Sequence, residues 1–508
     1  MKKENVKRIC WSLFIILSEI FIYFQMVIEK TEITIKYKLT YIAICILANF
    51  ALLVLFWYLN KKEIVKIEKV FLLIAVFFGI LYLLFIPALL GTDELPHFLR
   101  PYQISVGDII VKNPEKNETL IPKDLGEFVG ESVMSKRYSK DNILKSVEYS
   151  DMVNLWNGNV TSINYSPIPY TPQIIGFWIA RFLQLSPLFT IFLVRLLNFI
   201  TWIILAYFSI KLLPSKKIFA TILYTSPAIL SLVSTCNVDV LVLGLLLLLI
   251  SYVLNLIQTK RNLNKKDYIL MLFMSIGICT YKMFYVIYIL FLFLIPKQCF
   301  ENKNKKKVKS LLGIFMISLL IDFGWFALTS MESTMGNEVV SEQIRFILNN
   351  PFKYLGIFIN TYINDIYYYI TNFVCGTEMC YGLVRINELF IISYLFVLIC
   401  SYFDGKKNPE TSKVGKSLIV LVTLGIFGLV STALYLDWTS FKIGIGAPKI
   451  VGIQSRYFFS LVIPLIMLLP NCSKREIKGK NIFKYAIILD TLLIVNCIQS
   501  LLIRVFPN

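Results

Sequence analysis

The 508-residue chain is 57% hydrophobic and 16% charged, a composition that excludes an ordinary soluble domain and is typical of a membrane protein. Its formal net charge of +19 first suggests nucleic acid as a partner. The segments assigned to one side of the membrane, however, carry 30 of the 51 lysines and arginines with only eight acids. Because short basic loops stay in the cytoplasm, this excess indicates membrane orientation, and no nucleic acid is expected.

Apolar runs of roughly 17–25 residues, each long enough to cross a bilayer, recur along the chain and predict an all-α polytopic membrane protein. The clearest runs are Ile9–Ile28, Leu39–Leu59, Val70–Leu90, Pro187–Ile210, Val238–Ile257, Leu311–Leu328, Ser417–Leu436 and Tyr485–Ile503. Shorter candidates are Ile218–Val233, Tyr268–Thr280, Met283–Ile295, Leu389–Phe403 and Phe458–Leu469. Together they predict a bundle of about thirteen transmembrane helices.

The charge of the loops predicts the orientation. The basic excess places the N-terminus in the cytoplasm, and Ile9–Ile28 is expected to be a retained span because no Ala-x-Ala cleavage site follows it. Three polar regions then lie outside the cell, at 91–186, 330–388 and 437–456. Two units are expected. Residues 1–69 would form an N-terminal two-helix transmembrane hairpin, and residues 70–508 the main transmembrane domain.

The first two outer regions are expected to fold onto the helices. Mixed charge and turn residues at 91–186 predict a small folded unit, in which Ile174–Leu185 is a helix lying in the membrane interface. Region 330–388 mixes apolar and polar residues, which also predicts interfacial helices. Cys375 and Cys380 both fall in this outer region, where a disulfide is permitted, but the sequence does not decide whether they pair.

Asp93 and Glu94 directly follow a predicted span and form the most prominent candidate site. If a helix begins after Thr92 as its N-cap, Asp93 and His97 share a face, with Arg100 three residues further on. A partly desolvated carboxylate at the membrane edge can have its pKa raised towards the range of a general base. The alternative is an interfacial ion pair of either acid with Arg100 that holds the loop down.

A proline-rich run and a predicted helix start supply further candidates. The prolines between Tyr165 and Gln173 stiffen the chain, so that Tyr165 and Tyr170 can pack against a sugar or headgroup. Physical arguments alone favour a rigid lead-in to the next helix. Asn237 and Asp239 lie at the outer end of two spans, where helix capping and substrate binding explain them about equally well.

Several isolated charges lie in or beside the predicted spans. Lys282 either extends its ammonium to the interface or faces a phosphate within the bundle. Arg456 is either an interfacial anchor or a bidentate phosphate ligand. Arg195 falls within a span and is expected to pair with Asp322 or Asp490, because intramembrane charges normally face the interior and pair.

Taken in chain order, these runs resemble the bacterial polytopic membrane proteins of domain-of-unknown-function family 2142, which look like a branch of the GT-C glycosyltransferases. The resemblance covers about residue 70 to the C-terminus, and the order of the runs is more specific than any one of them. The matching runs are Asp93-Glu94-x-x-His97-Phe98-x-Arg100, Tyr165-Ser166-Pro167-x-Pro169-Tyr170-x-Pro172-Gln173, Arg195-Leu196-Leu197-Asn198, Ser234–Asp239, Tyr281-Lys282-x-x-Tyr285 and Gly452-x-Gln454-x-Arg456-Tyr457-Phe458.

The resemblance implies inverting transfer of a sugar from a polyprenyl-phosphate donor to a cell-envelope glycan or glycolipid acceptor on the outer face. Asp93 is implied as the general base, with Glu94 as its substitute or as an acceptor-positioning group. A polyprenyl phosphate leaves without protonation, so the site needs fixed cations. The available cations are Lys282, Arg456, His97 and Arg100. Substrate contacts are expected from Tyr165, Tyr170, Gln173, Asn237, Asp239, Tyr281, Gln454 and Tyr457.

Other possibilities stay open. No cofactor is demanded, although Asp93, Glu94 and Asp239 can hold a divalent cation. A lipid-linked glycan flippase or another transporter would use the intramembrane charges along a continuous cavity and would survive the loss of Asp93. A polysaccharide polymerase or ligase would depend chiefly on outer arginines and histidines, and the chain has one histidine.

Overall fold

A computed structural model of the chain describes residues 66–110, 118–134, 140–156, 165–300, 303–330, 337–376, 388–403, 407–469 and 480–505, with six single positions between 39 and 54. The hairpin expected at 1–69 therefore lies almost entirely outside the described residues. Within these ranges five helices are long and apolar enough to cross a membrane, so the larger predicted number is not confirmed. They are α3 (Ile67–Phe85), α8 (Pro187–Leu212), α11 (Asp239–Thr259), α13 (Lys303–Ser330) and α18 (Lys413–Leu434).

The shorter apolar runs also form helices, but three of them differ from a single α-helix. The run at 218–233 is divided into α9 (Lys217–Tyr224) and α10 (Pro227–Val233). Pro227 cannot continue the hydrogen bonds of α9, and the Ser226 side chain caps the new helix. The run at 283–295 is a 3₁₀ helix, η4 (Met283–Leu294), and the run at 458–469 is divided between the 3₁₀ helix η8 (Ser455–Leu461) and α20 (Val462–Ile466). The other two short runs form α12 (Lys265–Cys279) and α17 (Glu388–Tyr402), and the longer run at 485–503 forms α21 (Lys480–Val505).

The described residues between 91 and 186 include two strands as well as helices. An antiparallel pair of strands, β1 and β2, places Glu118 opposite Trp156. A buried apolar core that includes Phe98, Leu125 and Phe177 joins this segment to α8. Its elements are α4 (Glu94–Ser105), β1 (Glu118–Pro122), α5 (Lys123–Met134), α6 (Lys140–Leu144), β2 (Met152–Trp156), η3 (Ile168–Tyr170) and α7 (Thr171–Phe182).

Residues 337–376, the described part of the second predicted outer region, are mostly helical, whereas their position at a membrane interface stays a prediction. Cys375 ends α16 as a buried free thiol, and Cys380, its candidate disulfide partner, lies outside the described residues. The helices of this region are α14 (Asn337–Asn349), α15 (Pro351–Asn364) and α16 (Ile366–Cys375). The turn after α18 contains the π-helical η7 (Tyr435–Thr439) and α19 (Ser440–Lys442).

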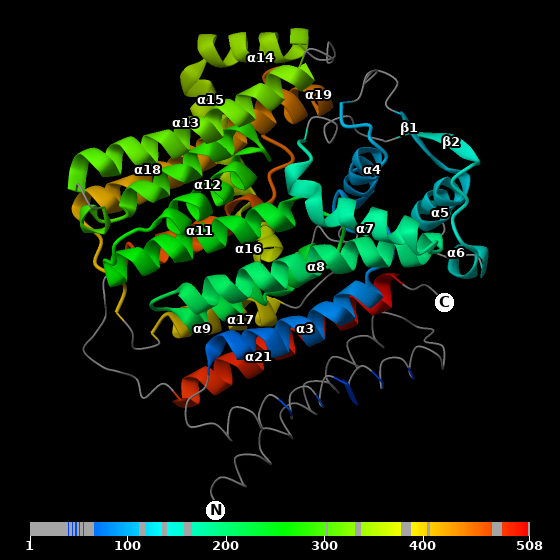
Figure 1. Cartoon of the computed structure of the whole chain (residues 1–508), viewed down its shortest axis with the longest axis horizontal. Coiled ribbons are helices and arrows are strands. Elements are labelled where there is room, and N and C mark those ends of the chain that lie inside the picture. The colour runs from blue at the N-terminus through cyan, green and yellow to red at the C-terminus, as the bar shows by residue number, and fades with distance from the viewer. Residues whose placement is uncertain are drawn as a thin grey trace, which may run out of the picture.

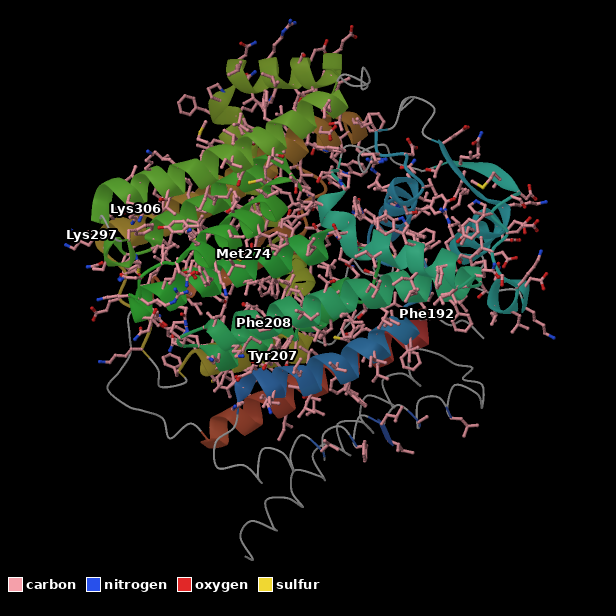
Figure 2. The ribbon with its side chains drawn as sticks, in the orientation of Figure 1. Phe192, Tyr207, Phe208, Met274, Lys297 and Lys306 are labelled. Carbon is pink, nitrogen blue, oxygen red and sulfur yellow. The ribbon has the colours of Figure 1, made fainter. Side chains whose placement is uncertain are left out.

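The long helices run side by side, and the predicted outer and inner segments lie at their opposite ends. Figure 1 shows α5 and α6 of the 91–186 segment at one end of α8, with α4 near the same end. Lys297 of η5 (Lys297–Cys299) and Lys306 of α13 lie together at the opposite end of the bundle (Figure 2). Both lysines belong to 297–309, one of the basic segments that the distribution of charge assigns to the cytoplasmic side. This separation agrees with the predicted alternation of the loops, and the direction of the protein in the cell stays a prediction.

Candidate functional site

A turn of unusual backbone conformation presents Asp93 at the start of α4. After α3 ends at Phe85, Leu89 and Asp93 both adopt the left-handed region, with φ values of 63° and 56°. Asp93 takes the N-cap position, one residue later than the Thr92 N-cap that the sequence predicts. Non-glycine residues persist in this conformation only where surrounding contacts hold them there. The buried contacts of the next residue, Glu94, hold the turn in this conformation.

Glu94 is fully buried and ties three segments together. Its two carboxylate oxygens each accept a hydrogen bond of 2.7 Å from the guanidinium of Arg195 on α8. They also accept the backbone N–H groups of Gly91 and Cys236, at 2.9 and 2.8 Å. The same guanidinium donates to two backbone carbonyls just after α3, both at 2.7 Å. Because both oxygens are occupied away from solvent, Glu94 has a structural role here in place of the catalytic or acceptor-positioning role that the sequence predicts.

Arg195 is therefore paired differently from the sequence prediction, which assigned it to Asp322 or Asp490. Asp490 instead accepts a hydrogen bond from Thr225 at 2.7 Å. Sequence reasoning missed the partner of Arg195 and the contribution of Asn198, whose side chain donates to two carbonyls of the segment before α11. The spacing of Arg195 and Asn198, three residues apart on α8, was a usable signal because such residues share a helix face.

Arg456 joins two carboxylates that come from distant parts of the chain. Its Nη2 lies 2.7 Å from Oδ2 of Asp93, and its Nε lies 2.9 Å from Oδ2 of Asp239. The side-chain amide of Gln454 donates a further hydrogen bond of 3.3 Å to Asp93. The side chain of Asp93 is 48% exposed, against 8% for Asp239 and 11% for Arg456. Asp93 is thus the carboxylate of this pair that an incoming molecule can reach.

Two tyrosines and a lysine lie against the same carboxylates. The Tyr281 hydroxyl donates to Asp239. The Lys282 ammonium lies 4.8 Å from the ring centroid of Tyr281 and 4.2 Å from that of Tyr457, which is within cation–π range. Burial lowers the pKa of Lys282 to about 8, with Asp239 opposing the shift, so the side chain stays largely cationic at neutral pH. We call Asp93, Asp239, Lys282 and Arg456 the charged cluster.

His97 borders the charged cluster without adding to its positive charge. A hydrogen bond of 2.7 Å joins its Nδ1 to the Tyr170 hydroxyl, and its ring stacks on Tyr165 with 6.0 Å between centroids. Burial lowers the pKa of His97 to about 4, although Asp93 and Asp239 oppose the shift. The imidazole is therefore neutral near pH 7 in this structure, which does not favour the predicted phosphate-binding cation, and the role of His97 stays a prediction.

The pKa of Asp93 shifts in the direction opposite to the one the sequence predicts. Partial burial disfavours the ionised carboxyl, but the charge of Arg456 and the hydrogen bonds from Arg456 and Gln454 outweigh burial and lower the pKa. The expected rise assumed desolvation without a cation in contact. Asp93 is consequently an anion at neutral pH, and it is a weak base for as long as Arg456 holds it.

Three other predicted site residues support the backbone around the cluster. Arg100 is buried and donates to two carbonyls of the segment after α4, so it is not among the phosphate-facing cations. Gln173 donates to the Asn198 side chain and to the Asn237 carbonyl. Asn237 accepts the backbone N–H of Asp239, the first residue of α11, at 2.9 Å, although Val238 is the N-cap residue of this helix. The Asp239 carboxylate joins the cluster.

The three carboxylates considered for a divalent cation do not gather at one point. Glu94 is directed at Arg195, while Asp93 and Asp239 share Arg456. In the described ranges no three histidine, cysteine, aspartate or glutamate side chains are placed to hold a metal ion. The ligand set that the sequence suggests is thus not assembled in this conformation.

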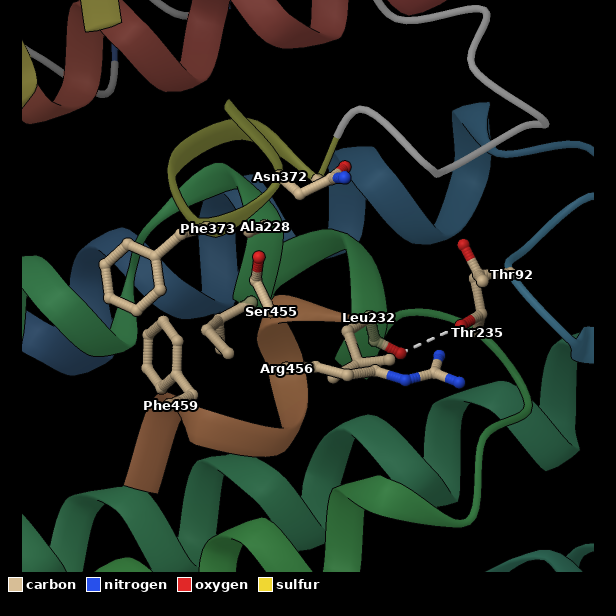
Figure 3. Close-up of a pocket in the computed structure, with 11 residues that line it drawn as sticks. Thr92, Ala228, Leu232, Thr235, Asn372, Phe373, Ser455, Arg456 and Phe459 are labelled. Carbon is tan, nitrogen blue, oxygen red and sulfur yellow. Dashed lines mark hydrogen bonds between the residues drawn. The ribbon is translucent and has the colours of Figure 1, made fainter. Parts of the chain in front are cut away.

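A pocket that is partly open to solvent lies beside Arg456 (Figure 3). Residues of α10, α16 and η8 form its mostly apolar wall. At one end the ring centroids of Phe373 and Phe459 lie 5.1 Å apart. Figure 3 shows the guanidinium of Arg456 directed away from those rings, towards Thr92 and Thr235. Thr92 immediately precedes Asp93, so the pocket reaches the edge of the charged cluster.

The comparisons with known proteins identify a family and no individual relative. A family model described as "Predicted membrane protein (DUF2142)" matches residues 72–467. The matched range begins within α3, ends just after α20 and includes all four residues of the charged cluster. No curated protein and no solved structure matches the chain.

Proposed function

The chain belongs to this family of predicted membrane proteins, and we propose that it is a GT-C-type glycosyltransferase of the bacterial cell membrane. It transfers a sugar, with inversion, from a polyprenyl-phosphate donor to a cell-envelope glycan or glycolipid acceptor on the outer face. The observation that carries the proposal is the charged cluster itself. There an accessible carboxylate, Asp93, lies within ion-pair distance of Arg456, beside an apolar pocket.

The proposed reaction needs a base on one side of the anomeric carbon and cations on the other. Asp93 accepts the proton of the acceptor hydroxyl as that oxygen forms the new glycosidic bond. The bond from the anomeric carbon to the phosphate oxygen breaks, and the polyprenyl phosphate leaves with the electron pair. Lys282 and Arg456 supply the fixed positive charge that stabilises the leaving oxygen, so no general acid is required.

Arg456 couples the base to the donor in this proposal. Before the donor binds, the guanidinium keeps the pKa of Asp93 low. A donor phosphate competes with Asp93 for the same cation, and loss of that partner raises the pKa of the carboxylate. Asp93 therefore becomes an effective base when a donor is present, which favours binding of the donor before the acceptor.

Transfer from synthetic polyprenyl-phosphate sugars tests the proposal directly. The full-length protein in lipid nanodiscs is given each donor with candidate glycan acceptors, and nucleotide sugars serve as control donors. We expect transfer from lipid-linked donors only, with the anomeric configuration of the product inverted by NMR. Retained configuration, or transfer from nucleotide sugars alone, contradicts the proposal.

The two competing functions are separated with the same materials. A flippase moves the lipid-linked sugar between leaflets without breaking the glycosidic bond, and it continues to do so in Asp93→Asn. The contacts of Arg195 with Glu94, and of Asp490 with a threonine hydroxyl, favour structural roles for these charges over an ion path. A polymerase or ligase that relies on outer histidines is not favoured, because His97 is buried and neutral.

The pH dependence of donor use is expected to follow Lys282. Burial lowers the pKa of this ammonium to about 8, so it is cationic below that pH and loses its charge above it. Because kcat/KM for the donor reports groups of the free enzyme, its value should fall as pH rises through about 8. In Lys282→Arg the charge persists to about pH 12, and the fall near pH 8 should disappear.

Lys282→Gln supplies the matched control for this measurement, because it lacks the charge at every pH. We expect it to have a low kcat/KM with no inflection near pH 8. A wild-type inflection that persists unchanged in Lys282→Arg would assign the titration to another group.

A further inference from the structure

The pocket beside Arg456 combines an apolar interior with one cationic end. Ala228 of α10, Phe373 of α16 and Phe459 of η8 contribute to its wall, and Arg456 lies at its edge (Figure 3). These are the properties of a site for an amphiphile with an anionic head.

The cationic end retains unused hydrogen-bonding capacity. Nε and Nη2 of Arg456 contact Asp239 and Asp93, whereas Nη1 is buried and has no hydrogen-bond partner within the described part of the chain. Buried guanidinium N–H groups normally have partners, so an unpaired one beside a cavity indicates a missing acceptor. A phosphate oxygen is the acceptor that guanidinium geometry matches best.

We propose that this pocket binds the first isoprene units of a prenyl phosphate, with the phosphate at Arg456 and the chain against Phe373 and Phe459. The inference rests on the proposed function and adds to it the place where the lipid enters the site. The rest of the chain would lie in the bilayer, because the pocket accommodates only the start of a long prenyl tail.

The shape and chemistry of the pocket favour a prenyl phosphate over an ordinary phospholipid. The pocket has one cationic end and one apolar wall, which suits a head on a single chain. A phospholipid would bring a second acyl chain, for which the pocket offers no second apolar wall. The flat double bonds of isoprene units can stack on the paired rings of Phe373 and Phe459.

Photolabelling of the full-length protein in nanodiscs tests the proposal. The probes are a short prenyl phosphate and a phosphatidic acid, each with a diazirine in the chain, and labelled peptides are identified by mass spectrometry. We expect the prenyl probe to label α10, α16 and η8, with labelling reduced by excess unlabelled prenyl phosphate but not by inorganic phosphate. Labelling elsewhere, or equal labelling of the pocket by phosphatidic acid, overturns the proposal.

Ala228→Phe adds a variant test, because the larger side chain fills the pocket from α10. Losing the burial of two methylene groups already corresponds to about a tenfold loss of binding, so labelling should fall by at least that factor. Gly313→Phe on α13 is the matched control, since a Cβ there meets no atom within 4 Å. Equal labelling in Ala228→Phe and Gly313→Phe argues against the pocket. If Ala228→Phe does not fold, the labelled peptides of the wild type still show whether the prenyl probe binds in the pocket.

Measuring sugar transfer in parallel distinguishes failure of this inference from failure of the proposed function. If the wild type is labelled in the pocket but transfers no sugar, the pocket assignment stands and the transferase proposal falls. If the wild type transfers sugar, and Ala228→Phe does so equally well, the transferase proposal stands and the pocket assignment falls.

Discussion

Asp93→Asn is expected to lower kcat for sugar transfer by about 10²–10⁴-fold, the range typical for removal of a general base. Asparagine keeps the size of the side chain and can still accept a hydrogen bond from Gln454, but it cannot take a proton from the acceptor. The backbone at this position has a φ of 56°, which asparagine tolerates well. A loss of activity in this variant therefore reports the missing carboxylate rather than a disturbed turn.

The same substitution should leave donor binding intact or improve it. In the wild type, Asp93 competes with the donor phosphate for Arg456 at 2.7 Å. Removing that negative charge frees one side of the guanidinium, so KM for the sugar donor should stay equal or fall although kcat decreases strongly. A lower kcat together with an unchanged or lower KM is expected for a base that shares its cation with the sugar donor. A folding defect would reduce the amount of active protein but would not lower KM.

Asp151→Asn is a suitable control, since it removes a carboxylate from the same outer region. The side chain of Asp151 is 58% exposed, and its carboxylate lies 3.7 Å from the Lys123 ammonium at the surface. We expect its transfer activity to match that of the wild type. Normal turnover in Asp93→Asn, in protein that folds like the wild type, would remove Asp93 from the mechanism.

The sequence predicts the long helices well because hydrophobic length alone specifies them. The run Pro187–Ile210 becomes α8 at Pro187–Leu212, and Val238–Ile257 becomes α11 at Asp239–Thr259. Hydropathy does not reveal the break before Pro227, because apolar residues continue on both sides of it. The pairing of β1 with β2 is also hidden, since it joins short segments separated by two helices.

The site shows the same division between local and long-range information. Asp93, Asp239, Lys282 and Arg456 are recognisable one by one, because each is a charged residue at the edge of an apolar run. Their pairing is not recognisable, since Arg456 lies 363 residues after Asp93. The direction of each pKa shift depends on those pairings. Sequence reasoning therefore located these residues and misjudged the pKa of Asp93 and the charge of His97.

Glu94→Gln is expected to destabilise the protein by about 3–5 kcal/mol, the usual cost of removing one partner from a buried ion pair. Arg195 is only 1% exposed, so its charge would be left without a counterion inside the bundle. The Glu94 carboxylate accepts hydrogen bonds from N–H groups of Gly91, Cys236 and Arg195. Glutamine would direct its own NH₂ group at some of these N–H groups, so those hydrogen bonds would be lost. Thermal unfolding in detergent, compared with the wild type, measures the loss.

Asp151→Asn serves again as the comparison, because it breaks an ion pair on the surface. Exposed pairs contribute about 0–1 kcal/mol, so its melting temperature should stay close to that of the wild type. If Glu94→Gln melts like Asp151→Asn, the buried pair does not stabilise the fold as its geometry indicates.

A double-variant cycle separates the ion pair from the backbone contacts that each partner makes. Arg195→Met leaves the Glu94 carboxylate buried without a cation, so we expect a loss comparable to that of Glu94→Gln. The double variant removes both charges, and its loss should fall short of the sum of the single losses by about 0.5–3 kcal/mol. It should still be less stable than the wild type, because the N–H groups of Gly91 and Cys236 lose their carboxylate and the carbonyls after α3 lose their guanidinium. Strictly additive losses would mean that these backbone contacts, and not the attraction between the charges, hold the turn that presents Asp93.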